Sequence, residues 1–264
     1  MEKGTERIRK EIIRLKEKKY RDECGQFIIE GLRFVNEIPD NYIIKEYVFS
    51  ESFSNEKALY EFEKKGKCFV FDEKTFKEIS DTNSPQGIMA VLEKKTFTPE
   101  DIIKNSGKNP VYIIAEELND PGNLGTIIRT ADACKTDGIF LSKGSVDLYN
   151  SKVLRSTMGS LFHIPTAVDG TIDEYAALLR KNGVTIYAAH LKGEKMLYDI
   201  DLTGPSAFLI GNEARGLSDE ASELADMLIK IPMPGKAESL NASVAASVLM
   251  YEAVRQRIKK PQGV

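Results

Sequence analysis

The chain has 264 residues, of which 42% are apolar and 29% are charged, a composition that suits one large α/β domain or two small ones. Its 37 Lys and Arg and 40 Asp and Glu residues give a formal net charge of −3, which excludes a protein held to nucleic acid by bulk positive charge, although not a local basic patch. No apolar run reaches the ~20 residues that span a bilayer, and residues 1–23 lack the apolar core of a signal peptide, so we expect a cytoplasmic protein without a membrane partner.

The chain begins with a predicted amphipathic helix, because Ile8, Ile12 and Leu15 fall on one stripe of a basic segment. A second basic segment, Arg255–Val264, ends the chain. Two solvated helix ends are the more common explanation of such segments, and two phosphate-contacting surfaces on an acidic body are the alternative; composition does not decide between them.

Short β-rich runs then alternate with helical segments, which predicts a sheet with helices on its faces. The expected strands are Gln26–Glu30, Lys45–Ser50, Cys68–Phe71 and Ile88–Leu92, and the expected helices are Leu32–Ile38, Asn55–Lys65 and Glu73–Ile79. Five aromatic residues of this region have strand or helix spacing and are assigned to its core rather than to base stacking: Phe27, Phe34, Tyr42, Tyr47 and Phe49.

Periodicity is lost over Lys94–Pro110, where Pro, Gly, Asn and Ser accumulate. This composition indicates a linker. We therefore expect a first domain over residues 1–95, a linker over 96–108 and a second domain over 109–264.

The second domain contains near-continuous apolar runs, which are typical of parallel strands covered on both faces. The runs are Val111–Ala115, Gly138–Leu141, Val184–Ala188, Ala207–Ile210 and Met227–Ile231, and the longest predicted helix is 241–259. Ligands bind beyond the carboxyl ends of such strands, so polar residues there are candidates for a site.

The loop after Val111–Ala115 contains Asn123, Gly125 and Arg129 around a predicted helix start. The simpler interpretation is a turn with Asn123 as the N-cap and Arg129 as a solvated helix residue. The single Gly122-x-x-Gly125 spacing is too weak to indicate a dinucleotide site.

Glu213 follows the apolar run Ala207–Ile210 and lies between Gly211 and Gly216. Gly211 would let the backbone approach a ligand, and Gly216 would allow a turn with positive φ. An ordinary helix start capped by Ser218 explains the serine. It does not explain a carboxylate between two glycines.

The loop after Met227–Ile231 contains Ser239 and Asn241, followed by small residues. Asn241 as an N-cap is the simpler interpretation. The small residues would allow another backbone or a flat ligand to pack closely.

These three loops resemble the three motifs of the TrmH/SpoU family of RNA ribose 2′-O-methyltransferases in the SPOUT superfamily. The matching segments are Asn123–Arg129, Gly211–Leu217, and Ile231–Gly235 with Ser239–Val244. Lys152–Pro165 is similar to the family's segment between its first and second motifs, and Phe27–Val35 and Ser84–Val91 are similar to the RNA-substrate-binding domain that precedes it in many members.

The resemblance implies an α/β fold in which a small ribosomal-protein-like α/β/α domain precedes a SPOUT-type domain with a mainly parallel sheet and a deep trefoil knot. It also implies a homodimer and S-adenosylmethionine as the cofactor, with no metal. By motif match, the residues that contact the cofactor would be Ala189, Gly211, Ile231, Met233 and Leu240. The catalytic residues would be Arg129, Glu213, Asn241, Asn123 and Ser239.

For Arg129 the family offers two roles, as the base that removes the 2′-hydroxyl proton or as an anchor for the adjacent phosphate. Guanidinium groups lose a proton only above pH ~12, so we favour the anchor. Glu213 would orient Arg129 or a neighbouring donor. The substrate would be ribosomal RNA, with transfer RNA second, and either housekeeping or resistance methylation fits.

Two other classes of protein are alternatives to the enzyme. A non-catalytic RNA-binding or ribosome-assembly protein on the same fold would have no reason to keep Asn123, Arg129, Glu213 and Asn241 together. A nucleotide-dependent oxidoreductase would need a phosphate-binding fingerprint that the sequence lacks.

With three scattered cysteines and two histidines, the sequence favours reduced thiols and predicts neither a disulfide framework nor a zinc site. These residues are Cys24, Cys68, Cys134, His163 and His190.

Overall fold

The computed structural model describes residues 1–193 and 195–258, which form two compact units. Unit 1 comprises Met1–Lys95 and Tyr149–Phe162, and unit 2 comprises Thr96–Leu148 and the described residues from His163 onward. Residues 149–162 therefore pack with the N-terminal part of the chain. Lys259 and Lys260 of the basic C-terminal segment lie outside the described residues.

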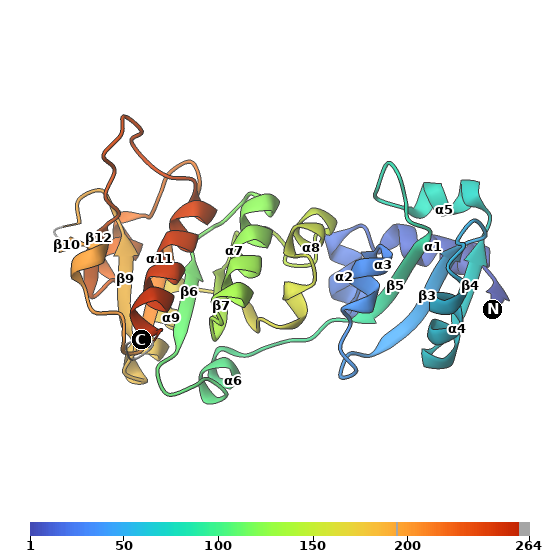
Figure 1. Cartoon of the computed structure of the whole chain (residues 1–264), viewed down its shortest axis with the longest axis horizontal. Helices are drawn as coiled ribbons and strands as arrows, with labels where there is room; N and C mark the ends of the chain where they lie inside the picture. Colours follow the sequence, from blue (N-terminus) through green and yellow to red (C-terminus); the bar gives the residue numbers. More distant parts are fainter. Residues whose placement is uncertain (194, 259–264) are drawn as a thin grey trace, which may run out of the picture. The chain divides into compact units, whose positions relative to one another are not determined.

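Unit 1 is built on a mixed five-stranded sheet in the order β1-β4-β3-β5-β2 (Figure 1). Strands β1, β4 and β3 are parallel, and β5 runs antiparallel to both β3 and β2. The elements are β1 (Glu2–Lys3), α1 (Glu6–Arg14), α2 (Lys18–Cys24), β2 (Gln26–Glu30), α3 (Leu32–Asn36), β3 (Ile44–Ser50), α4 (Glu56–Lys65), β4 (Cys68–Phe71), α5 (Glu73–Ile79), β5 (Ile88–Glu93), α8 (Ser151–Thr157) and the 3-10 turn η1 (Ser160–Phe162).

The core of unit 1 confirms the predicted stripe of the first helix, since Ile8, Ile12 and Leu15 are all buried. Ile8 and Ile12 pack with β-strand residues such as Val48 and Phe69. The five aromatic residues assigned to the core are also buried, none more than 9% exposed. The assignment to the core is therefore confirmed.

Unit 2 contains a seven-stranded sheet in the order β10-β12-β9-β11-β6-β7-β8, and all its strand pairs are parallel. Its elements are α6 (Pro99–Lys104), β6 (Val111–Ala115), α7 (Pro121–Ala133), β7 (Gly138–Ser142), β8 (Thr166–Gly170), α9 (Ile172–Lys181), β9 (Thr185–Ala189), β10 (Lys195–Met196), the 3-10 turn η2 (Leu197–Asp199), β11 (Ser206–Ile210), α10 (Asp219–Glu223), β12 (Met227–Lys230) and α11 (Ala242–Arg257). The α/β class with a mainly parallel sheet is confirmed, and the trefoil knot stays a prediction.

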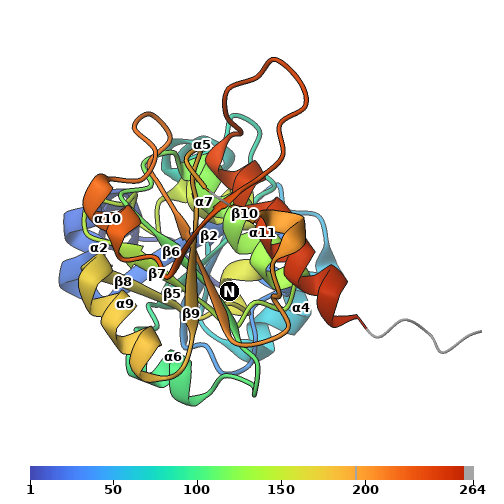
Figure 2. The ribbon, with the colours of Figure 1, turned by 90° about the vertical axis from the view of Figure 1, so that its left-hand side faces the viewer.

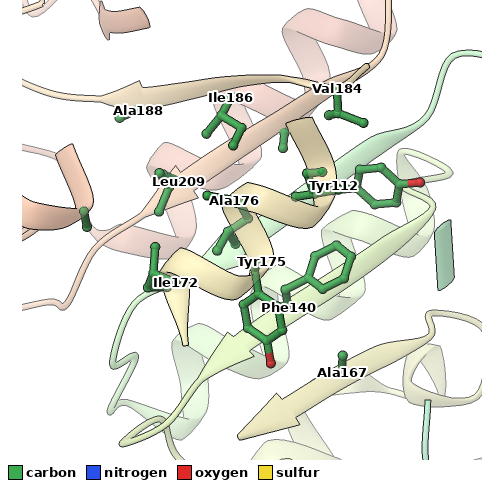
Figure 3. Packing of buried hydrophobic residues seen from close by; sticks show 14 of the residues in the cluster. Tyr112, Phe140, Ala167, Ile172, Tyr175, Ala176, Val184, Ile186, Ala188 and Leu209 are labelled. Carbon is green, nitrogen blue, oxygen red and sulfur yellow. The ribbon is translucent and has the colours of Figure 1, made fainter. Parts of the chain in front are cut away.

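Helices cover both faces of this sheet, with α7 and α11 packed together on one face and α6 and α9 on the other (Figure 2). On the α6 and α9 face, the ring of Phe140 contacts both Tyr112, edge to face, and Tyr175, at a tilted angle (Figure 3). Because central strands are buried on both faces, their sequences read as unbroken apolar runs.

The predicted linker differs from the structure, because residues 99–104 form helix α6. Thr98 caps this helix, Pro99 occupies its first turn, and Ile102 is buried in the core of unit 2. The abundance of Pro, Gly, Asn and Ser in the neighbouring sequence concealed it. Within the described residues, no helix is both long enough and apolar enough to cross a membrane.

Candidate functional site

A pocket of about 360 Å³ lies beyond the carboxyl ends of β9, β11 and β12. Parallel sheets of this type bind ligands at that edge, and sites for small molecules usually measure ~300–1,000 Å³. All five residues predicted to contact a cofactor belong to the pocket lining, namely Ala189, Gly211, Ile231, Met233 and Leu240. Three strand-end loops that are distant in the sequence thus meet in one cavity.

Gly211 makes the closest backbone approach in the pocket wall. A Cβ atom at this position would lie 2.2 Å from the carbonyl carbon of Gly216 and 2.3 Å from the nitrogen of Leu217, so no other residue fits without moving the loop. Gly216 has a φ of +72°, which a glycine adopts without strain. The predicted turn at Gly216 agrees with the geometry, whereas the close approach at Gly211 is to the backbone of its own loop, and an approach to a ligand there stays a prediction.

Asn212 keeps the loop after β11 folded against the loop after β6. Its amide donates to the carbonyl oxygen of Glu117 at 2.8 Å, and its Oδ1 accepts from the backbone nitrogens of Ala214 and Arg215 at 2.9 and 3.2 Å. Reciprocal backbone bonds join Asn212 to Gly216. The side chain is 8% exposed, so each of these bonds replaces contact with water.

Glu213 binds the start of α7 rather than Arg129. Its Oε1 accepts from the backbone nitrogen of Asp120 at 2.9 Å and from Nδ2 of Asn123 at 3.0 Å, and its Oε2 accepts from the backbone nitrogen of Asn119 at 3.1 Å. Of the two partners expected for this carboxylate, the neighbouring donor is therefore the one observed.

The same contacts set the charge of Glu213. Burial raises the pKa of this carboxyl, but the hydrogen bonds from Asn123, Asn119 and Asp120 outweigh that effect and leave the pKa below its usual value. Glu213 is therefore an anion at neutral pH and complements the positive end of helix α7.

Asp120, and not Asn123, is the N-cap of α7, since its Oδ1 accepts from the backbone nitrogen of Asn123 at 2.8 Å. Asn123 instead turns inward and is 8% exposed. The interpretation of Asn123 as the cap is thus wrong, because the preceding aspartate takes that position and frees the Asn123 amide to reach Glu213.

Arg129 lies on the same helix and is exposed. Its guanidinium group forms no hydrogen bond or ion pair within the described part of the chain. It is not among the residues that line the pocket of its own chain. Its guanidinium group is therefore available to an external anion.

Ser239 and Leu240 line the pocket immediately before α11. Asn241 is the N-cap of that helix and accepts hydrogen bonds from the backbone nitrogens of Ser243 and Val244 and from Oγ of Ser243. The capping interpretation of Asn241 is confirmed, and Asn241 is not a lining residue of the pocket.

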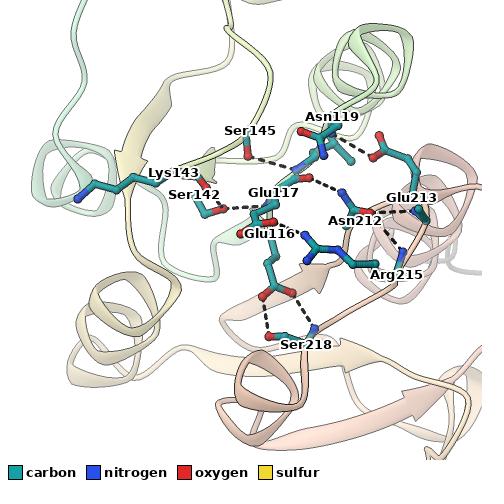
Figure 4. A network of polar contacts seen from close by, with 12 residues as sticks. Glu116, Glu117, Asn119, Ser142, Lys143, Ser145, Asn212, Glu213, Arg215 and Ser218 are labelled. Atoms are coloured by element: carbon teal, nitrogen blue, oxygen red, sulfur yellow. Dashed lines mark hydrogen bonds and ion pairs between the residues drawn. The ribbon is translucent and has the colours of Figure 1, made fainter.

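Polar residues that the sequence interpretation passed over connect the loop after β6 with the loop after β11 (Figure 4). Glu116 accepts from the backbone nitrogen and the hydroxyl of Ser218, and Glu117, whose φ is +43°, forms an ion pair with Arg215. Ser218 also caps α10, as expected. The signal in the sequence that could have revealed this network is the pair of consecutive glutamates directly after a buried strand.

The pocket fits the predicted cofactor on two observations. Gly211 lets its loop fold tightly along the pocket wall, because its missing Cβ atom would meet the backbone of Gly216 and Leu217, and the apolar side chains of Ile231, Met233 and Leu240 line the cavity. The described residues contain no group of three or more His, Cys, Asp or Glu side chains that could hold a metal ion.

Comparisons with known proteins match both parts of the chain. Residues 110–251 match the model of the SpoU rRNA Methylase family, and residues 6–90 match the MRM3-like substrate binding domain. The 23S rRNA (guanosine(2553)-2'-O)-methyltransferase RlmP of Bacillus subtilis (strain 168) is 34% identical over 239 residues, which cover 90% of this chain and 92% of that relative.

Solved structures agree over nearly the whole length. An AdoMet-bound rRNA methyltransferase from Sinorhizobium meliloti has a TM-score of 0.86 at 33% identity and covers 98% of both chains. The SpoU methyltransferase AviRb from Streptomyces viridochromogenes in complex with AdoMet has a TM-score of 0.88 at 27% identity, over 98% of this chain and 100% of that one.

Proposed function

The chain belongs to the SpoU rRNA methylase family, and we propose that it transfers a methyl group from S-adenosylmethionine to a ribose 2′-hydroxyl of ribosomal RNA. The observation that carries this proposal is the pocket around Gly211, in which the second and third motif loops meet the loop after β9. The first motif is joined to this pocket by the hydrogen bond from Asn123 to Glu213. The name of the relative RlmP and the AdoMet-bound neighbours support the same reaction, and they favour ribosomal over transfer RNA.

Within the pocket, Ala189, Gly211, Ile231, Met233 and Leu240 would hold the cofactor. When bound, S-adenosylmethionine supplies a methyl group that its positively charged sulfur already activates. The chain must therefore align the ribose hydroxyl and assist loss of its proton, rather than activate the methyl group.

Arg129 is the residue we assign to the ribose side of the reaction. Its guanidinium is free of internal partners, so it can bind the phosphate next to the target ribose and stabilise the negative charge that develops on the 2′-oxygen. Glu213 acts one step away as a positioning residue, because it holds Asn123 and the first turn of the helix that carries Arg129. Ser239 and Asn241 keep the geometry of the loop before α11.

We also propose that the active protein is a homodimer in which α7 and α11 contact the partner chain. Val244 and Tyr251 are 46% and 54% exposed and, seven residues apart, lie on one side of α11. Arg129 is not among the residues that line its own pocket, so a dimer that brings it to the partner's pocket would complete the site.

The two domains would have different roles in the reaction. Residues 1–95 would bind RNA together with residues 149–162, which pack in the same unit. The rest of residues 109–264 would carry the knotted catalytic domain, joined by helix α6 of the predicted linker, in a protein that acts in the cytoplasm. The deciding experiment incubates the purified protein with labelled S-adenosylmethionine and unmodified ribosomal RNA. Label in RNA 2′-O-methyl groups is expected. Cofactor binding without label would favour a non-catalytic RNA-binding protein.

A further inference from the structure

The guanidinium groups of three arginines have no hydrogen bond, ion pair or ring contact within the described part of the chain: Arg33, Arg129 and Arg155. The other arginines all have such a partner, such as Glu11 for Arg7 and Asp226 for Arg180. Because the chain is acidic overall, an RNA ligand must be held by local positive groups. Arg129 is assigned to the reaction, which leaves two guanidiniums of unit 1 to explain.

Arg33 and Arg155 line the same pocket of unit 1, which has a volume of about 290 Å³ and is called here the Arg33/Arg155 pocket. Arg33 comes from α3 and Arg155 from α8 (Figure 1). Helix α8 packs against β2 of the same unit. The pocket is lined by Glu30, Gly31, Arg33, Phe34, Thr82, Ser84, Gln86, Arg155 and Met158.

The one carboxylate in this lining is already engaged elsewhere. Glu30 accepts hydrogen bonds from Oγ of Ser80 at 2.6 Å, from Oγ1 of Thr82 at 2.8 Å and from the backbone nitrogen of Asp81 at 3.2 Å. It therefore holds the turn after α5 and forms no ion pair with either arginine. The pocket keeps a net positive charge that suits a phosphate.

Met158 gives the pocket an exposed apolar side chain at an unusual backbone position. It ends α8 with a φ of +51°, a left-handed conformation for which glycine or asparagine is preferred. Its side chain is nevertheless 41% exposed, while Phe34 in the same lining is buried. Met158 therefore presents an exposed apolar side chain to whatever occupies the pocket.

We propose that the Arg33/Arg155 pocket binds one unpaired nucleotide of the substrate RNA, with the two guanidiniums on its phosphates and Met158 against its base. Proteins read single-stranded RNA in this manner, by charge on the backbone and by flat apolar contact with a splayed base. The inference rests on the proposed function. It adds that α8, which falls in the part of the chain matched by the methylase model, takes part in substrate recognition.

The test measures the affinity of the full-length protein for unmodified ribosomal RNA at several salt concentrations. We expect Arg33→Ala and Arg155→Ala each to weaken binding about tenfold and to reduce the slope of log affinity against log salt by about 0.7 to 0.9, the loss of one phosphate contact. Arg7→Ala is the matched control, because Arg7 also lies in unit 1, is exposed and carries the same charge.

Two further measurements separate the base from the phosphate. Met158→Asn keeps a residue that tolerates the left-handed cap, and it should weaken RNA binding without changing the salt slope. Wild-type protein should also prefer a hairpin with a bulged nucleotide over the fully paired duplex, and Met158→Asn should lose that preference. Equal binding of the bulged hairpin and of the fully paired duplex by the wild type would overturn the proposed nucleotide site.

The failure of this inference is distinct from that of the proposed function. If the wild type methylates ribosomal RNA but Arg33→Ala and Arg155→Ala behave like Arg7→Ala, the pocket does not bind RNA. If the wild type transfers no methyl group to RNA, the proposed function is wrong, and the assignment of RNA as the ligand of this pocket is wrong as well. Affinity for S-adenosylmethionine should be unchanged in all these variants.

Discussion

Nδ2 of Asn123 donates a hydrogen bond of 3.0 Å to Oε1 of Glu213, and this bond joins two motifs that lie 90 residues apart. The same carboxylate accepts from the backbone nitrogens of Asn119 and Asp120, so one side chain fixes the start of α7 to the loop that forms the pocket wall. The position of Arg129, on that helix, thus depends on the loop after β11.

Replacing Glu213 should therefore change stability in a pH-dependent way. The pKa of Glu213 is lowered in the folded chain, so its contribution is fully present above the usual value of 4.5 and is lost as the pH falls through the lowered value. Glu213→Gln should lower the Tm most at neutral pH, and the difference from the wild type should shrink below about pH 4. Glu223→Gln, an exposed change on α10, is the control. A pH-independent difference would contradict the role of the charge.

Gly211→Ala should weaken cofactor binding strongly with only a moderate loss of stability. The added methyl group meets backbone atoms of Gly216 and Leu217 at 2.2 to 2.5 Å, so the pocket wall must move, at a cost of about 1–3 kcal/mol. Calorimetry with S-adenosylmethionine should show at least tenfold weaker binding. Gly204→Ala is the matched control, because nothing lies within 4 Å of its added Cβ. Unchanged affinity in Gly211→Ala would remove this pocket as the cofactor site.

Arg129→Ala should lower kcat by about 100-fold or more, the size of effect seen when one group that stabilises developing charge is removed. Affinity for S-adenosylmethionine should stay within about twofold, because Arg129 does not line the pocket. Arg129→Lys should recover part of the rate, since it keeps the charge but not the planar fork. Methyl transfer at the wild-type rate by Arg129→Ala would discard the assignment.

Mixing two inactive variants tests whether Arg129 serves the partner's pocket. In mixed dimers of Arg129→Ala and Gly211→Ala, one chain keeps an intact pocket and the other keeps the arginine. Random exchange makes half of the dimers mixed with one complete site each, so about a quarter of the wild-type activity should return. If Arg129 serves its own chain, the mixture stays inactive.

The strands of unit 2 were largely predictable, because central parallel strands carry unbroken apolar sequences. Those of unit 1 were predictable because short β-rich runs alternate there with helical segments. Strand β8 was missed: its residues Val168 and Asp169 are exposed at the edge of the sheet, so the apolar pattern is weak there. Helix α6 was missed although Thr98 followed by Pro99 is a helix-start pattern, since the composition around it resembles a linker.

The site was predictable where a residue type itself has a physical consequence, as with Gly216 and its positive φ. Asn212 was missed because its role depends on a carbonyl group 95 positions away, which spacing within a loop does not reveal. Asn123 was assigned to the wrong local role for the same reason, since its partner Glu213 is equally distant in the sequence.

The most direct test of the central claim is a map of ribose methylation on ribosomal RNA from a wild-type strain and a strain that lacks this protein. One 2′-O-methyl group should disappear in the deletion strain, return with the wild-type gene and stay absent with Arg129→Ala. Identical maps from the two strains would contradict the assignment of this chain as a ribosomal RNA methyltransferase.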